Sequence, residues 1–237
     1  MDASIAIPHL EEMAIATTRY LGALTVLTDE DMRAPSQLPD WSRGHVVTHL
    51  ARNADALCNL VRWAQTGTEA PMYSSLQQRD GDIDSGADRP AHDLRVDSSA
   101  SAGRFLQAMN ELDLRHQDAQ VSRMAGGATF PARDIALVRR IEIEVHHADL
   151  DIGFSHQDWP ADFGDLMVTR VQDDRADGPA MVLRSTDTDG LWKYGVQGQG
   201  PEITGRSVDL AWWVLGRGAG TSLGSDADVL PDLGRWR

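Results

Sequence analysis

The stretch Arg139–Leu150, with the sequence RRIEIEVHHADL, combines a helical pattern of apolar residues with five acidic or imidazole side chains. On a helix with about 100° per residue, the apolar residues of this stretch and its flanks fall on one side. That apolar arc is formed by Ile135, Val138, Ile141, Val145, Ala148 and Ile152. Glu142 falls inside the arc, and His146 lies near its margin. Because a carboxylate on a buried face is costly unless it is paired or binds a metal, this pair becomes a candidate metal-ligating pair.

Three neighbours of this pair need separate interpretations. Glu144 lies well away from the apolar arc and His147 lies nearly opposite to it, so we expect both side chains at the surface. Asp149 lies near the margin of the arc, where it could orient a ligand histidine or form a salt bridge at the helix end.

A third candidate ligand comes from a helix far upstream, which Ser42 is suited to cap and which runs to Thr66. His49 flanks the core stripe of this helix, and His45 lies further out. The stripe consists of Val46, Leu50, Ala54, Leu57 and Val61. Two histidines and one carboxylate from two helices can hold Zn²⁺, Fe²⁺, Ni²⁺ or Mn²⁺ and leave a position open. A buried hydrogen bond between Glu142 and a histidine, without any metal, is the alternative.

The remaining pattern predicts an α+β protein of two domains, residues 1–155 and 156–237. Helices expected at about 8–28, 42–66, 98–115 and 132–151 indicate a four-helix bundle with crossover loops, and the polar segment 68–90 is expected to be mostly loop. The second domain is expected to be small and α/β. Its predicted elements are a helix at 161–173, a hairpin of 181–184 and 191–196, a strand at 203–204, and a helix at 208–215 that Ser207 caps.

Composition excludes several functions. The formal net charge of −14 argues against nucleic-acid binding, and an anionic substrate would need local arginines. No apolar run approaches the roughly 20 residues that span a bilayer, and the N-terminus does not resemble a signal peptide, so we expect a cytoplasmic protein. We expect a monomer and leave a dimer open.

The single cysteine and four further histidines receive no functional role from the pattern. Cys58 is alone, which rules out an internal disulfide and an all-thiolate zinc site, and we expect it to be buried. His9, His92, His116 and His156 stand in polar surroundings, and we expect them at the surface.

Two longer stretches resemble a known family. The run Trp41–Tyr73, WSRGHVVTHLARNADALCNLVRWAQTGTEAPMY, closely resembles the mycothiol-dependent maleylpyruvate isomerases of actinobacteria. The run Arg140–Leu150 resembles the second metal-binding segment of that family, and Leu215–Gly218 with the terminal Gly-Arg-Trp resembles its C-terminal domain. The likeness covers most of the chain and is weakest at 80–130 and 160–205.

The resemblance implies a DinB-like metal-binding four-helix bundle followed by a small α/β domain. It places zinc on His49, Glu142 and His146, the residues that the helix faces also select. Two active-site arginines would correspond to Arg79, by its distance from the Pro-Met-Tyr motif, and to Arg217, within the shared Gly-Arg-Gly.

The activity that the resemblance implies is the metal- and mycothiol-dependent cis–trans isomerisation of maleylpyruvate to fumarylpyruvate in gentisate breakdown. Thiolate addition to the alkene, rotation and elimination would accomplish it. Cys58 is poorly placed to be the thiol, so a low-molecular-weight cofactor, mycothiol, is expected beside the small-molecule substrate, whose carboxylates the two arginines could hold. Two rivals are a mycothiol S-transferase for other electrophiles and a non-catalytic bundle for binding or stress sensing.

Overall fold

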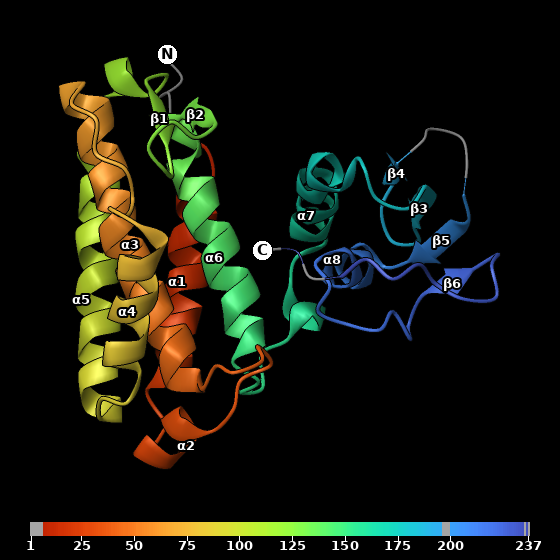
Figure 1. Ribbon diagram of the computed structural model, residues 1–237, viewed down its shortest axis with the longest axis horizontal. Helices are drawn as coiled ribbons and strands as arrows, with labels where there is room; N and C mark the ends of the chain where they lie inside the picture. Colours follow the sequence, from red (N-terminus) through yellow and green to blue (C-terminus); the bar gives the residue numbers. More distant parts are fainter. Residues whose placement is uncertain (1–6, 196–199, 235, 237) are drawn as a thin grey trace. The chain divides into compact units, whose positions relative to one another are not determined.

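Four long helices pack side by side in the first part of the chain (Figure 1). They are α1 (Leu10–Leu24), α3 (Arg43–Thr66), α5 (Ala91–Asn110) and α6 (Ile135–Asp149). Helix α3 is central, because it packs against both α5 and α6, and α1 closes the bundle against α5 and α6. The computed structural model describes residues 7–195, 200–234 and 236. The predicted four-helix bundle is confirmed.

Helix α3 begins and ends where the sequence indicates. The Ser42 hydroxyl accepts a hydrogen bond from the backbone N–H of His45 at 3.3 Å, and the His45 ring accepts one from the Ser42 N–H. Gly67 ends the helix in the left-handed conformation, with φ of 71°. The stripe of Val46, Leu50, Ala54 and Leu57 is fully buried, as predicted.

The segment 68–90 was expected to be mostly loop, and this expectation is wrong, because it contains helix α4 (Leu76–Ala87). Ser75 caps its first turn by accepting from the Gln78 N–H at 3.1 Å. Its glycines and aspartates have poor helix propensity, and packing on α3 compensates for this. A Cβ added at Gly86 would lie 2.6 Å from the Thr48 Cγ2, so the two helices approach closely there.

Several boundaries differ from the predicted ones. The first helix is shorter than the predicted 8–28, and a second short helix, α2 (Asp29–Arg33), follows it. The third begins at Ala91 rather than near 98, because the Ala91 N–H donates to Asp29 at 2.7 Å, a long-range cap that local sequence does not reveal. The last bundle helix begins after a short 3-10 turn at Ala132–Asp134. An unpredicted hairpin, β1 (Gln120–Ser122) with β2 (Thr129–Pro131), precedes it.

The second part of the chain combines two helices with a four-stranded sheet. Helix α7 (Ala161–Gln172) packs on α8 (Ser207–Val214), and the sheet has the order β4-β3-β5-β6. The predicted hairpin is β3 (Met181–Ser185) with β4 (Leu191–Tyr194), and Val196 of the predicted second arm lies outside the described residues. The predicted third strand is β5 (Glu202–Gly205), parallel to β3, and β6 (Gly224–Ser225) was not predicted.

Contacts divide the chain into two units, Met1–Gly153 and Phe154–Arg237. We propose that these units fold as the two domains expected from the sequence, 1–155 and 156–237. Among the described residues, no helix combines the length and the apolar content needed to cross a bilayer.

The close approach at the start of α3 gives a first prediction. A Cβ added at Gly44 would lie 2.2 Å from the carbonyl oxygen of Ala87, so Gly44→Ala must displace backbone. We expect it to lower the free energy of unfolding in urea by about 1–3 kcal/mol. Gly103→Ala is the matched control, because nothing lies within 4 Å of its added Cβ, and it should stabilise by about 0.5–1 kcal/mol. Equal effects of the two substitutions would contradict the packing described.

Candidate metal centre

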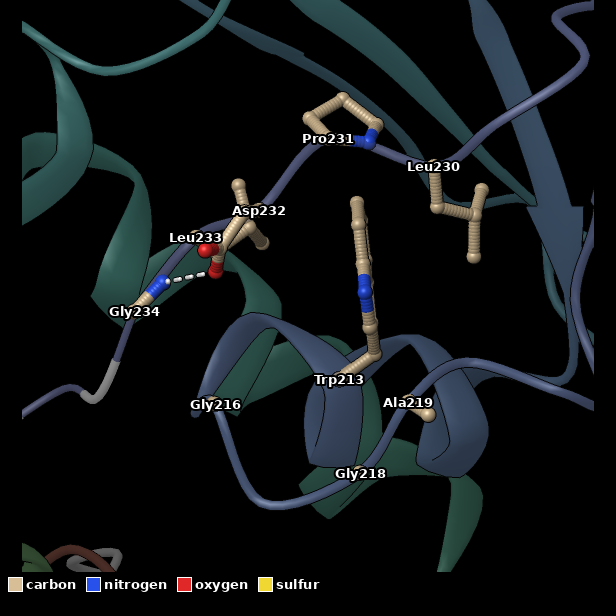
Figure 2. Close-up of a pocket in the computed structure, with 9 residues that line it drawn as sticks. All are labelled: Trp213, Gly216, Gly218, Ala219, Leu230, Pro231, Asp232, Leu233 and Gly234. Carbon is tan, nitrogen blue, oxygen red and sulfur yellow. Dashed lines mark hydrogen bonds between the residues drawn. The ribbon is translucent and has the colours of Figure 1, made fainter.

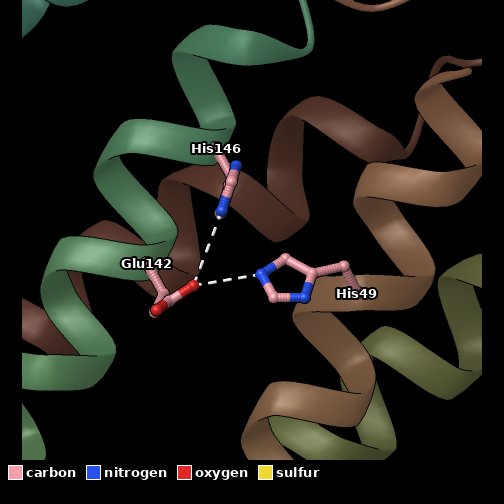
Figure 3. A group of neighbouring side chains, drawn as sticks. All are labelled: His49, Glu142 and His146. Carbon is pink, nitrogen blue, oxygen red and sulfur yellow. Dashed lines mark hydrogen bonds and ion pairs between the residues drawn. The ribbon is translucent and has the colours of Figure 1, made fainter. Parts of the chain in front are cut away.

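Three predicted side chains meet inside the bundle: His49 from α3 with Glu142 and His146 from α6 (Figure 3). One ligand atom from each lies within 4.8 Å of the others. The His49 Nε2 is 3.0 Å from the Glu142 Oε2, and the His146 Nε2 is 3.5 Å from the same oxygen. The two rings stand edge to face, 4.7 Å apart at their centroids. Two imidazoles thus converge on one carboxylate, an arrangement that could also hold a divalent ion.

The helices determine this convergence. Glu142 and His146 are one turn apart on α6, so their side chains share a face, and His49 projects from the facing side of α3. His49 is buried, whereas the Glu142 and His146 side chains are 19% and 14% exposed. The group therefore lies at the edge of the bundle interior, with two of its three side chains partly exposed.

Asp149 contacts the second nitrogen of His146. Its Oδ2 is 2.9 Å from the His146 Nδ1, and Asp149 itself is fully buried. The end of α6 is fixed against the start of α3, because the Arg43 guanidinium donates to the carbonyl oxygens of Leu150 and Asp151 at 2.8 Å each. The His146 ring is thus held with its Nε2 directed at Glu142, the geometry that the orienting interpretation of Asp149 requires.

The charges of the group are set by burial and by these contacts. Burial would raise the pKa of Glu142, but hydrogen bonds with His146 and His49 hold it well below its usual range. Burial lowers the pKa of His49 to about 4, and Glu142 offsets this only in part. For His146, burial is outweighed by Asp149 and Glu142, which raise its pKa to about 9. At neutral pH Glu142 is therefore ionised and His49 is neutral. His146 is protonated and lies between the carboxylates of Asp149 and Glu142.

The surface assignment of Glu144 and His147 is wrong. Both are buried, with 2% and 1% exposure. Glu144 pairs with the Arg19 guanidinium of α1 at 2.5 Å, and His147 packs edge to face on Tyr20. The cause is that α6 is covered on two sides, by α1 as well as by α3, so the side opposite the apolar arc is buried too.

Arg79, in the first turns of α4, lies beside the group. Its NH2 is 3.4 Å from the His49 Nδ1, its NH1 contacts Asp80 at 2.6 Å, and its guanidinium carbon is 6.0 Å from the centroid of the Tyr73 ring. Helix α4, in the segment that was expected to be loop, thus places the Arg79 guanidinium next to His49.

Arg217 belongs to the second unit and follows α8. Its guanidinium donates to the carbonyl oxygens of Leu215 at 3.2 Å and Trp236 at 3.0 Å. The glycines on either side of it line a cavity of about 330 Å³, in which the Trp213 indole forms a wall (Figure 2). These contacts define where Arg217 sits within its own unit.

The expectations for three histidines and for Cys58 need correction. His156 is partly buried rather than at the surface, since its ring stacks on Trp212 with centroids 5.0 Å apart and lies 3.2 Å from Asp209. His9 and His116 are also partly buried, whereas His92 is exposed. Cys58 is half-buried against the core, and burial raises the pKa of its thiol.

Sequence reasoning missed the polar residues around the three ligand candidates, above all Asn53, Tyr73 and Arg139. Asn53 lies one turn after His49 and Arg139 three residues before Glu142, so helical spacing places both on the faces that carry the group. That spacing was a usable signal for these two residues. Tyr73 follows a loop, and no periodicity indicates its position.

Comparisons with known proteins agree with this architecture. Residues 13–151 match the family described as "Mycothiol maleylpyruvate isomerase N-terminal domain". The crystal structure of a mycothiol-dependent maleylpyruvate isomerase matches with a TM-score of 0.90 and 26% identity, covering 96% of this chain and 95% of that chain. The crystal structure of a variant of that isomerase, with one histidine replaced by alanine, matches with a TM-score of 0.89 at the same identity and coverage. No curated protein matches.

The fold and the cluster of histidines and glutamate define a DinB-like helical bundle joined to a small α/β unit. The chain belongs to the mycothiol-dependent maleylpyruvate isomerase family, which is a family of enzymes. The resemblance noted in the sequence is confirmed.

The contact between Asp149 and His146 gives a second prediction, for protein freed of metal by a chelator. Histidine-ring NMR should show His146 titrating near pH 9, and Asp149→Asn should move this pKa toward the ordinary value near 6.5. Because the folded pKa is raised, the contact stabilises fully below about pH 6.5, and that stabilisation is lost as pH rises through about 9. Asp149→Asn should therefore cost more stability at pH 6 than at pH 10.

Asp84→Asn is the control, because this exposed carboxylate lies 3.9 Å from the His45 ring and not near His146. It should leave the His146 titration unchanged. An unchanged His146 pKa in Asp149→Asn would contradict the geometry.

Proposed function

We propose that the chain catalyses the metal- and mycothiol-dependent cis–trans isomerisation of maleylpyruvate to fumarylpyruvate, a step of gentisate breakdown. The convergence of His49, Glu142 and His146 carries the proposal, because it is a ligand set within a chain of this family. Its substrate and thiol are small molecules, and we place the reaction in the cytoplasm, where thiols are kept reduced.

The donor set fits a divalent ion, with Zn²⁺ the best match to two imidazoles and one carboxylate. His49 would ligate through Nε2 as a neutral ring, and Glu142 is already ionised. His146 would exchange its Nε2 proton for the metal and keep its Nδ1 proton on Asp149. Bound zinc would supply a Lewis acid that keeps a sulfur ligand as thiolate near neutral pH.

Mycothiol would supply the sulfur that adds to the alkene and leaves after rotation. The chain's own Cys58 is not suited to this, since it is half-buried and its thiol pKa is raised. Positive side chains must counter the charge of the dianionic substrate in a protein of net charge −14. We assign this role to Arg79, which already lies 3.4 Å from His49, and to Arg217 of the second unit.

Metal content gives a third prediction. Wild-type protein loaded with zinc and freed of excess should hold about one equivalent by elemental analysis, and Glu142→Ala should hold far less, because one of three ligands is lost. Glu144→Gln is the matched control, because it alters the buried glutamate on the other face of α6 and should keep its zinc even though it loses the pair with Arg19. If the wild type takes up no zinc, or if Glu144→Gln loses it and Glu142→Ala does not, the assigned ligands are wrong.

Turnover gives a fourth prediction. The zinc-loaded protein should convert maleylpyruvate to fumarylpyruvate only when mycothiol is added, and Arg79→Gln should raise KM more than it lowers kcat, because a carboxylate contact is lost in ground state and transition state alike. Product analysis by chromatography and mass spectrometry distinguishes the reaction types. Isomer formation without net consumption of thiol supports the proposal, whereas a stable thioether would assign the chain to S-transfer.

A further inference from the structure

A second polar contact joins α3 and α6 next to the three ligand candidates. The Arg139 NH1 donates to the Asn53 Oδ1 and to the carbonyl oxygen of Leu50, each at 2.8 Å. Arg139 is 2% exposed, and no carboxylate forms an ion pair with it among residues 7–195, 200–234 and 236. Burying a guanidinium without such a partner costs folding free energy. The charge of Arg139 also supplies positive potential on the Glu142 side of the bundle.

The chemistry of arginine fixes the orientation of Asn53. A guanidinium has only donors, so the Asn53 amide must present its oxygen to Arg139. The NH₂ group of Asn53 is then directed elsewhere, as a donor. Asn53 is buried one turn beyond His49, on the same face of α3.

Tyr73 is held in place through the residue that precedes it. The preceding residue, Met72, is buried in the core, its N–H donates to the Arg123 carbonyl at 3.2 Å, and its carbonyl accepts from Asn59 at 3.5 Å. The Tyr73 hydroxyl oxygen is shielded from solvent, yet within the described part of the chain it completes no hydrogen bond of normal geometry. Burial, followed by the charge of Glu142, raises the pKa of Tyr73, whereas Arg79 and Asn53 oppose this as nearby donors.

The Tyr73 hydroxyl donates no hydrogen bond among the described residues. The Arg79 guanidinium has only donors, and the Asn53 oxygen already accepts from Arg139, so the NH₂ group of Asn53 is left for the phenol oxygen. The Glu142 Oε2 is already in contact with both imidazoles. A buried O–H in this situation is a preorganised donor for an oxygen that enters with the substrate. Arg139 donates to the Asn53 oxygen, so the NH₂ group of Asn53 is the donor that remains available to Tyr73.

We propose that the Tyr73 hydroxyl donates a hydrogen bond to the substrate's keto oxygen, on which negative charge develops, and that Asn53 and Arg139 fix its direction. This rests on the proposed function and concerns a 2,4-dioxo acid with a conjugated cis alkene. As the carbon–sulfur bond forms, the alkene electron pair moves to the keto oxygen, and it returns when that bond breaks. The hydroxyl proton stays on Tyr73, so no net proton transfer is needed. Tyr73 is a catalytic residue in this account, and Asn53 and Arg139 are positioning residues.

The first test is Tyr73→Phe, which keeps the ring and removes the donor. In the zinc-loaded enzyme with mycothiol, we expect kcat to fall about 100-fold while KM and zinc content change little. Tyr20→Phe removes another buried hydroxyl of the bundle that completes no hydrogen bond in the described residues, and it should leave kcat unchanged. An unchanged kcat in Tyr73→Phe would overturn the proposal.

The second test reverses the direction of donation. Asn53→Asp still accepts from Arg139, but its other oxygen offers an acceptor to Tyr73 and turns the hydroxyl hydrogen away from the substrate. We expect kcat to fall as in Tyr73→Phe, and the double variant to fall no further, because both changes remove the same bond. Multiplicative losses in the double variant would overturn the coupling.

A binding measurement separates this proposal from the proposed function. Acetylpyruvate keeps the dioxo acid and lacks the alkene, whereas maleate keeps the alkene and two carboxylates and lacks the ketone. By calorimetry with the zinc-loaded protein, Tyr73→Phe should weaken acetylpyruvate binding about fivefold and leave maleate binding unchanged. Equal effects on the two ligands would overturn the role of Tyr73. A wild type that binds them as expected but never isomerises maleylpyruvate would contradict the proposed function alone.

Discussion

The contact of two imidazoles with the Glu142 carboxylate is the constraint on which the site depends. An ionised carboxylate in the bundle interior requires compensating partners, and His49 and His146 supply them from opposite helices. The pairing fixes the register of α3 against α6 as well as the chemistry, because both helices must present these residues at the same level. Few rearrangements of either helix would preserve it.

Surrounding structure maintains this contact. Asp149 contacts the His146 nitrogen that is turned away from Glu142, and Arg43 links the end of α6 to the start of α3 by hydrogen bonds. Helix α4 packs along α3 and places Arg79 next to His49. Helix α4 has poor intrinsic helix propensity. Its close packing on α3, where Gly44 approaches Ala87 and Gly86 approaches Thr48, explains why it is nevertheless helical. The candidate ligand His49, its contact with Arg79 and the close packing of α4 all involve α3, so we expect α3 to be the element most sensitive to substitution.

The candidate ligands could be predicted from sequence because helical periodicity alone places Glu142 and His49 on facing sides. The same reasoning failed for Glu144 and His147, because it assumes one buried face, whereas α6 is covered by both α1 and α3. Helix α4 and the early start of α5 were missed for a different reason: each depends on a long-range contact, such as the cap from Asp29 to Ala91. Tyr73 could not be predicted, since a loop determines its position.

Anomalous diffraction at the zinc absorption edge, from crystals of the zinc-loaded protein, tests the central claim most directly. The account predicts one strong peak in the bundle, about 2.0–2.2 Å from the His49 Nε2, the His146 Nε2 and a Glu142 oxygen, with a further coordination position open. A peak bound by other residues, or no peak between α3 and α6 in crystals grown with zinc, would contradict it.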